Sequence, residues 1–496
     1  MSSAGSITAD QVAWQPKVNP WVIGVVVSLA AFMEVLDTSI ANVALPYIAG
    51  NLGASNDEST WVLTSYLVAN AIVLPINGFL VGWLGRKRFF LACIAFFTVS
   101  SFLCGVAPSL GLLLLFRVMQ GAFGGGLQPM AQAILADTFP PEKQGLAFAL
   151  YGITVVCAPA IGPPLGGWIT DNYSWRWIFY INVPVGALAA VLVYQLLQDP
   201  AHLPRIKKGT ARFDYVGFSL LAIGVAALQV VLDKGQEDDW FGSHFITTLI
   251  VIAGVGLVSL VIWESLQKDP IVEVRLFKNF NFASINVMLF AFGFLLLSGV
   301  VLLPQFLQTL MGYTAYKAGL VLSLVAVLLL CLMPLVGSFS AATWMRVWQY
   351  LPVGFLIVPL TMAGYVGLPP EKANAAAGLM NFMRNIGMSV GTSSVTTLIA
   401  RRSQYHQSVL AEYTRSGRFQ AAIEAMTTRL SHAGFSAHDA QRQALGRLYG
   451  MLQRQASALS YVEVYWLLAV IAAVMFLGSF LLKRNEPGKG GHVAVH

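Results

Sequence analysis

The chain carries little charge, because only 11% of its 496 residues are Asp, Glu, Lys or Arg. Soluble globular proteins carry about 25% charged residues. With 56% hydrophobic residues and a mean hydropathy of +0.67, this chain would expose a large apolar surface to water. The composition therefore predicts an integral membrane protein. It excludes a secreted soluble enzyme, a nucleic-acid-binding protein and a disordered chain.

Cysteine and catalytic motifs are also scarce. Four cysteines lie singly in apolar runs, at positions 93, 104, 157 and 331, which excludes a disulfide framework and a thiolate metal site. Residues 1–20 are polar and the first apolar run is too long for a cleavable signal peptide. H-E-x-x-H, G-x-S-x-G and P-loop patterns do not occur. We therefore expect no catalytic centre, no metal, no cofactor and no ATP-driven pump.

Apolar runs of about 20 residues, the length that predicts a membrane-spanning helix, dominate the chain. We expect thirteen of them, at 21–46, 60–83, 89–108, 110–136, 145–169, 177–197, 213–232, 244–265, 282–305, 316–337, 344–367, 374–400 and 458–482. The loops between the first ten alternate in charge, with basic clusters such as 86–88 opposite acidic ones such as 237–239. The positive-inside rule then places the basic loops and the N-terminus in the cytoplasm.

Two segments recur in the second half of the chain. RVMQGAFGGGLQP (117–129) is echoed by RVWQYLPVGFLIVP (346–359), and LPINGF (74–79) by MPLVGS (333–338). Parallel repeats of this kind are common in secondary transporters. The repeated segments are about 30 residues closer together in the second half, so we expect one helix and its loop to be deleted from this chain or absent from the sequence as given. An odd number of helices would place the two termini on opposite sides, although the basic tail favours the cytoplasm.

The predicted organisation has five parts. They are a cytoplasmic tail (1–20), a six-helix bundle (21–200), two additional linker helices (201–280), a C-terminal bundle short by about one helix (281–482) and a second tail (483–496). Residues 401–457 are the only sizeable polar segment. AAIEAMTTRL and AQRQALGRLYGMLQRQ have helical spacing there, which predicts a short helical excursion on the extracytoplasmic surface of the membrane.

Two acidic residues, Glu34 and Asp37, lie in the middle of the first predicted helix, within FMEVLDTSIANVALP (32–46). Three residues apart, they share one face of the helix. A charge inside the membrane costs at least about 2.5–3.5 kcal/mol, so it should face a wet cavity or an ion pair. Burial favours the neutral form of a carboxyl group, which suits it to load and release a proton. The alternative, a carboxyl that only hydrogen-bonds a neighbouring helix, stays open, above all for Glu34.

Arg117 is the only basic residue well inside a first-half helix, and Gly121, Gly124 and Gln128 follow it on the same face. Such a stripe of small and polar residues suits a cavity wall or a close helix contact. Arg117 can pair with a carboxylate and favour its ionised form, or it can serve only as a donor to backbone carbonyls. The polar residues expected to line a cavity are Asn42, Gln120, Gln128, Asn381 and Arg384. For Arg384, an extended side chain that reaches a surface is the alternative.

The predicted fifth span contains APAIGPPLGG (158–167). Three prolines remove helix donors and kink the helix: Pro159, Pro163 and Pro164. Three glycines permit close packing: Gly162, Gly166 and Gly167. This predicts a hinge or a packing seam at the interface between the halves. A simple packing motif is an equally good interpretation.

These segments resemble the major facilitator superfamily, specifically its 14-helix drug:proton antiporters of the EmrB/QacA type, over nearly the whole chain. LDTSIANVALP (36–46), LLLFRVMQG (113–121) and APAIGPPLGG resemble the family's first-helix, proton-transfer and antiporter motifs. WRWIFYINVPVG (175–186) and FDYVGFSLL (213–221) are typical of the 14-helix branch. The resemblance implies an all-α membrane fold of two pseudo-symmetric helical bundles plus two extra central helices, with proton-linked roles for Asp37 and Arg117. The missing stretch corresponds to the family's eleventh helix.

GFLVGWLGRKR (78–88) resembles the family's cytoplasmic loop motif, which holds the two halves together. The matching positions are Gly78, Gly85, Arg86 and Lys87. Gly82 stands at the usual acidic position and Trp83 at the following basic one, so the chain departs from the motif there.

The resemblance implies a proton-coupled multidrug exporter in the bacterial inner membrane. It would expel hydrophobic, often cationic or weakly acidic, compounds against proton entry and dock a periplasmic adaptor and an outer-membrane channel. Two alternatives remain: an exporter of one metabolite, such as a siderophore or lipid precursor, and a transport-dead scaffold or sensor. A membrane-embedded enzyme is disfavoured, because the sequence offers no nucleophile–base pair or metal-ligand set.

Overall fold

The computed structural model describes residues 18–199, 213–267, 270–313, 357–365, 368, 372–414 and 417–480. All regular elements in these ranges are helices. Nine of the described helices are long and apolar enough to cross a membrane, or ten if the bent α6 is included. The chain is therefore a multi-pass helical membrane protein, as its composition predicts.

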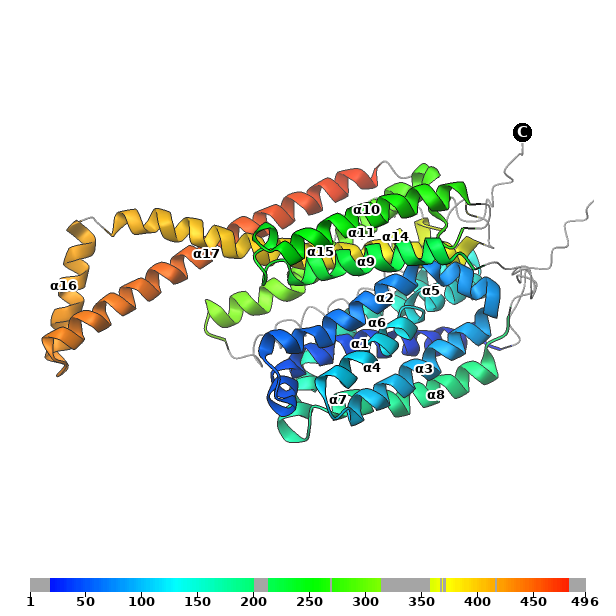
Figure 1. Ribbon diagram of the computed structural model, residues 1–496, viewed down its shortest axis with the longest axis horizontal. Coiled ribbons are helices and arrows are strands. Elements are labelled where there is room, and N and C mark those ends of the chain that lie inside the picture. The colour runs from blue at the N-terminus through cyan, green and yellow to red at the C-terminus, as the bar shows by residue number, and fades with distance from the viewer. Residues whose placement is uncertain are drawn as a thin grey trace, which may run out of the picture.

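The first half of the chain forms a bundle of helices that run back and forth along one axis (Figure 1). Its helices are α1 (Pro20–Leu52), α2 (Asn56–Leu84), α3 (Arg86–Val106), α4 (Leu110–Gly124), α5 (Leu127–Thr138), α6 (Pro141–Asn172), α7 (Trp177–Tyr180) and α8 (Asn182–Leu196). The predicted spans at 110–136 and 177–197 each consist of two helices. Ser55 starts α2 with a capping box, in which its side chain and that of Glu58 each accept the other's backbone N–H.

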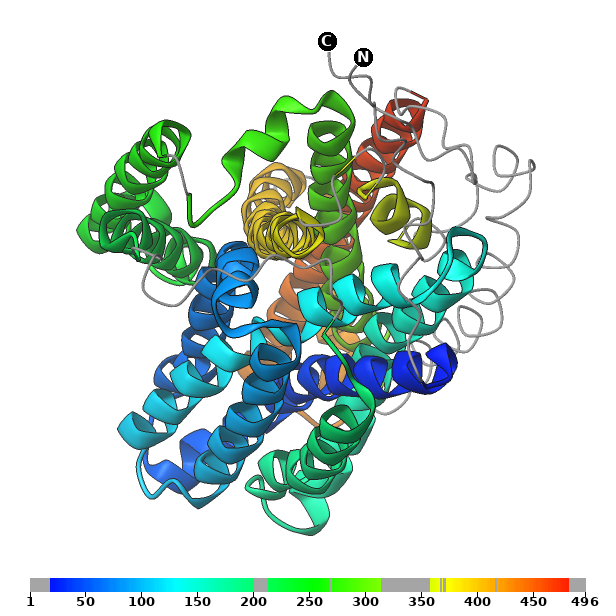
Figure 2. The ribbon, with the colours of Figure 1, turned by 90° about the vertical axis from the view of Figure 1, so that its right-hand side faces the viewer.

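Two additional helices, α9 (Tyr215–Lys234) and α10 (His244–Leu266), form a hairpin beside this bundle, joined by the short 3-10 helix η1 (Trp240–Gly242). Figure 2 shows the hairpin at the periphery. The inner helix α9 bonds to both halves, because Asp233 accepts from Thr64 on α2 and Gln229 donates to Ser389 on α15 at 2.9 Å. The outer helix α10 exposes a run of valines and isoleucines, as expected of a lipid-facing surface.

The second half contains η2 (Val274–Lys278), α11 (Phe280–Thr309), α14 (Ile357–Ala363), α15 (Ala373–Tyr413), α16 (Gly417–His432) and α17 (Ala437–Ser479). α15 lies near the middle of the molecule in the end-on view, between α11 and the first-half helices α2 and α5 (Figure 2). This position accounts for its polar sequence. Its polar residues Asn381 and Arg384 are 1% and 3% exposed, so they face protein and not lipid.

Only the last part of the predicted span at 344–367 lies within the described residues, where it forms α14. α14 ends beside the start of α11, where Asn281 donates to the carbonyl of Ala363, and Lys372 before α15 pairs with Glu273 at the same end. The start of α1 and the end of α17 also lie at this end, which agrees with the cytoplasmic preference of the basic tail (Figure 1). The predicted span at 316–337 lies outside the described residues.

Basic and acidic loops lie at opposite ends of the bundle. Arg86, Lys87 and Lys372 lie at the end where α1 begins, and Glu58 and Glu237 lie at the other. We call the end that carries Arg86 and Lys372 the cytoplasmic end, on the basis of the positive-inside rule.

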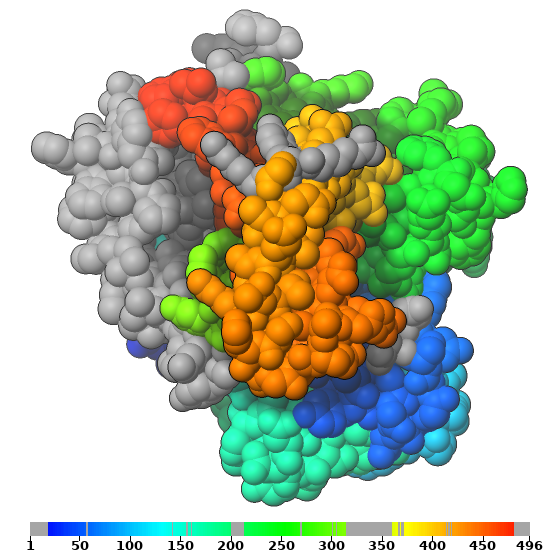
Figure 3. Space-filling view, turned by 90° about the vertical axis from the view of Figure 1, so that its left-hand side faces the viewer, coloured from blue at the N-terminus to red at the C-terminus, as the bar shows by residue number. Residues whose placement is uncertain are grey.

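An arm formed by residues 401–457 extends from the opposite end. The helices predicted there are present, as α16 and the first part of α17. The predicted location on the membrane surface is wrong, because the arm projects away from the bundle (Figure 1) and stands in the foreground when that end is viewed (Figure 3). No proline interrupts residues 401–457, so α15 and α17 continue outward without a break.

Glycines set the spacing between neighbouring helices in the first half. A Cβ on Gly121 would lie 2.2 Å from the backbone oxygen of Tyr66, and one on Gly124 would lie 2.6 Å from the Tyr66 hydroxyl. The predicted close contact of α4 is thus made with α2.

The glycines of the proline- and glycine-rich segment of α6 contact a helix of their own half. Gly162 packs against Ser39 and Gly166 against Ile40, both on α1, so the predicted seam between the halves is wrong for these two residues. The predicted close packing is wrong for Gly167, where a Cβ would meet its nearest neighbour, also on α1, at 4.0 Å, an ordinary van der Waals distance. Successive residues of a helix point about 100° apart, so Gly167 turns away from the contact that Gly166 makes and is only half-buried.

The predicted kink of α6 is present and lies at the first of its three inner prolines. The axis bends by 41° between the segment that ends at Pro159 and the segment Ile161–Asn172. Pro163 and Pro164 follow inside the second segment. A proline removes the hydrogen bond to the carbonyl four residues earlier and its ring clashes with that carbonyl, so Pro163 and Pro164 act at positions 159 and 160 and account for the bend.

We expect Gly121→Ala to destabilise the protein by about 1–3 kcal/mol, because the added methyl group collides with backbone that cannot move alone. Gly254→Ala is the matched control, since a Cβ at that exposed position on α10 meets nothing within 4 Å. Thermal unfolding of both variants in detergent measures the difference. An unchanged transition for Gly121→Ala would contradict the packing described here.

Candidate functional site

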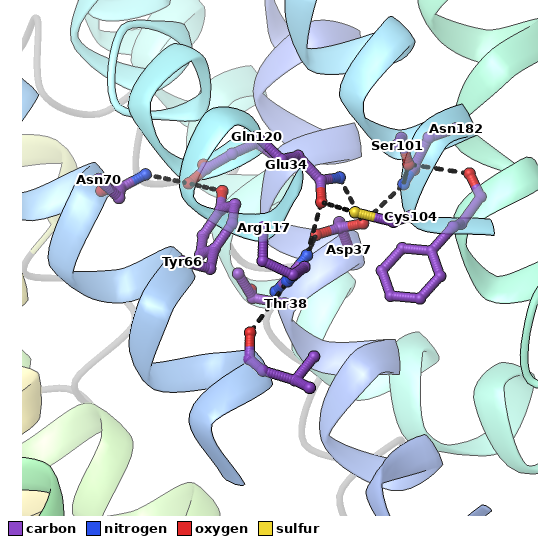
Figure 4. Close-up of polar contacts among 12 residues, drawn as sticks. Glu34, Asp37, Thr38, Tyr66, Asn70, Ser101, Cys104, Arg117, Gln120 and Asn182 are labelled. Carbon is purple, nitrogen blue, oxygen red and sulfur yellow. Dashed lines mark hydrogen bonds and ion pairs between the residues drawn. The ribbon is translucent and has the colours of Figure 1, made fainter. Parts of the chain in front are cut away.

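A buried ion pair joins α1 to α4 inside the first half. Arg117 Nη1 lies 2.6 Å from Asp37 Oδ2, and the two side chains are 0% and 1% exposed. The pairing considered for Arg117 is therefore present, with Asp37 as the carboxylate (Figure 4). A charge-assisted hydrogen bond of this length is strong because water does not compete for either partner.

The second oxygen of Asp37 accepts two amide donors. Gln120 Nε2 lies 2.9 Å and Asn182 Nδ2 2.7 Å from Oδ1. Asn182 also donates to Ser101 Oγ at 3.0 Å, which ties α8 and α3 to the site. The carboxylate thus receives three donors from three directions (Figure 4).

The guanidinium of Arg117 is held on several sides. Its Nε donates to the carbonyl of Val62 at 3.0 Å, and its Cζ lies 4.4 Å from the centre of the Tyr66 ring. Nη1 donates also to Gln120 Oε1 at 2.7 Å, whereas Nη2 has no hydrogen-bond partner in the described part of the chain. Arg117 therefore combines the two roles considered for it, carboxylate partner and donor to a backbone carbonyl.

Glu34 lies one helical turn from Asp37 but belongs to a different cluster. Its Oε1 accepts from the Tyr66 hydroxyl and from Asn70 Nδ2, both at 3.1 Å. Its Oε2 accepts from Gln128, whose own oxygen accepts from the Tyr151 hydroxyl at 3.0 Å. Tyr66 contacts Arg117 through its ring and Glu34 through its hydroxyl, so it connects the two carboxylates (Figure 4).

The Glu34 cluster reaches the second half through α15. Arg384 Nη2 donates to the same Gln128 oxygen, and Asn381 Nδ2 lies 2.7 Å from Gln132 Oε1 on α5. Both α15 residues point into the contact between the halves. The buried side chain of Arg384 speaks against the extended, surface-reaching alternative, and a role in lining a cavity stays a prediction.

The predicted contact at the cytoplasmic end is also present. Arg86 Nη1 lies 2.6 Å from Asp137 Oδ2 on α5, and Nη2 lies 3.4 Å from Asn374 Oδ1 just inside α15. A Cβ on Gly78 would lie 2.7 Å from the Cβ of Ala375, so the halves touch closely there. The acidic group that the loop motif lacks at Gly82 is supplied by Asp137, 51 residues after Arg86.

Two further residues of that motif shape the loop. Gly85 has φ +84°, a backbone conformation that favours glycine, where α2 ends and α3 begins. Lys87 donates to Asp199 through its backbone N–H at 2.7 Å and to the carbonyl of Tyr194 through Nζ at 2.6 Å. Lys87 therefore anchors the chain that follows α8.

Sequence reasoning missed several members of the site. Tyr66, Asn70 and Tyr151 are ordinary residues of predicted spans, and nothing in their local sequence marks them. Asn182 lies inside WRWIFYINVPVG, a segment noted only for its family likeness. Of the predicted cavity residues, Asn42 is exposed and makes no hydrogen bond in the described part of the chain.

Comparison with known proteins gives consistent results. The model of the Major Facilitator Superfamily matches residues 27–418. Multidrug export protein EmrB of Escherichia coli K12 is 38% identical over 505 positions, which cover 95% of this chain and 96% of that protein. Fatty acid resistance protein FarB of Neisseria gonorrhoeae is 37% identical, with 94% and 96% covered. Among solved structures, a peptide transporter of the POT family aligns with a TM-score of 0.52 at 11% identity, over 95% of this chain and 98% of that one, which supports the fold alone.

The same alignment bears on the expected deficit. The alignment with the Escherichia coli protein is 505 positions long and contains 95% of the 496 residues of this chain, so about 34 aligned positions have no residue in this chain. This number is similar in size to the shortage of about 30 residues estimated from the repeats, and the place of the shortage in the second half stays a prediction.

We expect Arg117→Met to destabilise the protein by about 3–5 kcal/mol, because it leaves the Asp37 carboxylate buried without its counter-charge. Adding Asp37→Asn should restore much of this loss, since no uncompensated charge then remains. Thermal unfolding of the three proteins tests this, and a double variant no more stable than Arg117→Met would contradict the pairing.

Proposed function

Because the chain belongs to the Major Facilitator Superfamily, we propose that it is a multidrug efflux transporter that expels hydrophobic compounds across the bacterial inner membrane in exchange for protons. The observation that carries this proposal is the buried pair of Asp37 and Arg117, with two amide donors on the second carboxylate oxygen. The likeness to multidrug export proteins over nearly the whole chain supports the same conclusion.

Asp37 is suited to carry the exchanged proton. When a proton binds to one of its oxygens, the carboxyl becomes neutral and the attraction to Arg117 falls. Gln120 and Asn182 lose a charged acceptor at the same time, so contacts of α4 and α8 with α1 weaken together. When the proton leaves, the pair and both amide bonds form again. Proton binding is thereby coupled to the packing of three helices.

The second half responds through the Glu34 cluster. Glu34 shares Gln128 with Arg384, so a change in the position or charge of Glu34 alters a contact between the halves. The bonds of Asn381 to Gln132 and of Arg86 to Asn374 would also have to break before the cytoplasmic end opens. A substrate shifts this equilibrium only through its different affinity for the two arrangements. Glu34 is therefore proposed as the residue that links proton binding to movement.

Asp37→Asn is expected to abolish proton-coupled efflux, since an amide cannot carry the proton. Everted vesicles with an imposed pH gradient and a fluorescent cation such as ethidium give the measurement. Glu424→Gln, an exposed carboxyl substitution on α16, should leave efflux and gradient dissipation within about twofold of the parent.

Efflux that persists at the parental rate in Asp37→Asn would overturn the proton role. Efflux of a single compound only, with no competition from other hydrophobic compounds, would favour the narrower exporter; the likeness to a fatty acid resistance protein keeps that alternative in view. If neither protein moves protons with any compound tested, the transport-dead scaffold gains support instead.

We further propose that the arm docks a periplasmic adaptor, which continues the path toward an outer-membrane channel. By the positive-inside rule the arm lies outside the cytoplasm. It carries eight arginines against three acidic residues, and it exposes Tyr405, Phe435 and Tyr449. Arginine and tyrosine are enriched in the core of protein interfaces, so an acidic partner fits this surface.

Replacing Arg429, Arg442 and Arg447 by serine should lower drug resistance of whole cells while efflux in everted vesicles stays unchanged, because only the cellular assay needs passage beyond the inner membrane. Lys143→Ser, an exposed basic residue at the cytoplasmic end, is the control and should affect neither assay. Resistance equal to the parent in the triple variant would argue against docking at these residues.

A further inference from the structure

The segment FDYVG (213–217), where α9 begins, builds a carboxyl group into a fixed position at the cytoplasmic end. Asp214 caps α9, and its Oδ1 accepts the backbone N–H of Gly217 at 2.9 Å. Its Oδ2 accepts the indole N–H of Trp263 on α10 at 2.7 Å. Asp214 is therefore well supplied with donors as an ionised carboxylate.

A second carboxyl group lies beside it with no side-chain donor. Glu264, near the end of α10, is 0% exposed, and no side chain within the described ranges donates to its oxygens. The backbone N–H groups of Ile271 and Val272 lie against its carboxyl group. A buried ionised carboxylate next to a second carboxylate is costly, whereas a protonated carboxyl group is neutral and can itself donate.

Gly217 brings the two carboxyl groups together. A Cβ at this position would lie 2.6 Å from Asp214 Oδ2 and also 2.6 Å from Glu264 Oε1. The two oxygens are thus no more than about 5 Å apart, on either side of the space that any other residue would fill. This explains the glycine in the segment: a side chain there would push the acids apart.

Among the described residues nearby, the basic groups of Lys372 and Arg275 have partners of their own. Lys372, before α15, pairs with Glu273 at 2.5 Å. Arg275 on η2 donates to the carbonyls of Ser265 and Gln267, at the end of α10. Glu273 adds a further negative charge near the pair, so the local field also disfavours two ionised carboxylates at Asp214 and Glu264.

We propose that Asp214 and Glu264 bind one proton between them, and that this proton holds the α9–α10 hairpin to the connection that leads into the second half. The proton sits on Glu264, whose O–H is then a donor toward Asp214. Loss of the proton leaves two like charges in a buried space, which separates the start of α9 from the end of α10. The site lies where α9 begins and α10 ends, at the cytoplasmic end, and it is separate from Asp37, so its proton is distinct from the exchanged proton.

The test uses the full-length chain carrying Asp37→Asn and Glu34→Gln, so that the two proposed transport carboxyls do not contribute. Infrared spectra recorded between about pH 6 and about pH 9 follow the carbonyl stretch of protonated carboxyl groups. We expect one band to disappear as the pH rises, and to be missing at every pH in Glu264→Gln. Glu273→Gln, which removes a nearby acid paired with Lys372, should retain the band.

Thermal unfolding gives a second readout with a definite sign. A proton held by the folded state contributes stability at low pH that is lost as the pH rises. The parent should therefore unfold at lower temperature at high pH, and the difference should be lost in Glu264→Gln. If Glu264→Gln fails to fold, Glu264→Asp replaces it in both measurements. This variant keeps a carboxyl group, so its band should remain, at a shifted frequency.

A pH-dependent band that persists unshifted in these Glu264 variants, or that vanishes in Glu273→Gln, would overturn the proposal. Neither measurement involves substrate movement, so a failure here is distinct from a failure of the proposed export function.

Discussion

The pairing of Asp37 with Arg117 is the interaction on which the first half depends. A buried ion pair gains little over apolar packing in net stability, yet removing one partner is severely destabilising. Here the pair collects contacts from α1, α2, α3, α4 and α8, since Val62, Gln120, Asn182 and Ser101 all bond to it directly or through one neighbour. The glycines of α4 let that helix approach α2 closely enough for Arg117 to reach the Val62 carbonyl. The close packing of α4 on α2 and the position of the Arg117 charge therefore depend on each other.

The two acidic residues of α1 have different partners because they lie one helical turn apart. Asp37 lies wholly within the first half and faces a guanidinium, whereas Glu34, one turn earlier, faces amides and hydroxyls and meets the second half through Gln128. Tyr66 touches both clusters. α1 can therefore transmit a change at one carboxyl group to the other by a small rotation, without any contact between the two acids.

Composition and local pattern were enough to predict helices and much of the site, and the failures have physical causes. Glu34, Asp37 and Arg117 stood out because charge is rare inside apolar runs, and a basic partner for an intramembrane acid follows from electrostatics. Asp137 could not be assigned to Arg86 in this way, since it lies at a span end where acids are common. The direction of the arm was missed because helical spacing reveals a helix but not whether it continues the one before it.

The unbroken length of α15 has a mechanical consequence. Its 41 residues form a rod of about 60 Å, fixed near the cytoplasmic end by Asn374 and less than a third of the way along by Arg384, with its last turns inside the arm. About 43 Å of the helix lies beyond Arg384, so a tilt of about 10° about that residue displaces the outer end by about 7 Å. The long outer part of α15 therefore enlarges small changes at the polar contacts around Arg384 into displacements that another molecule can sense.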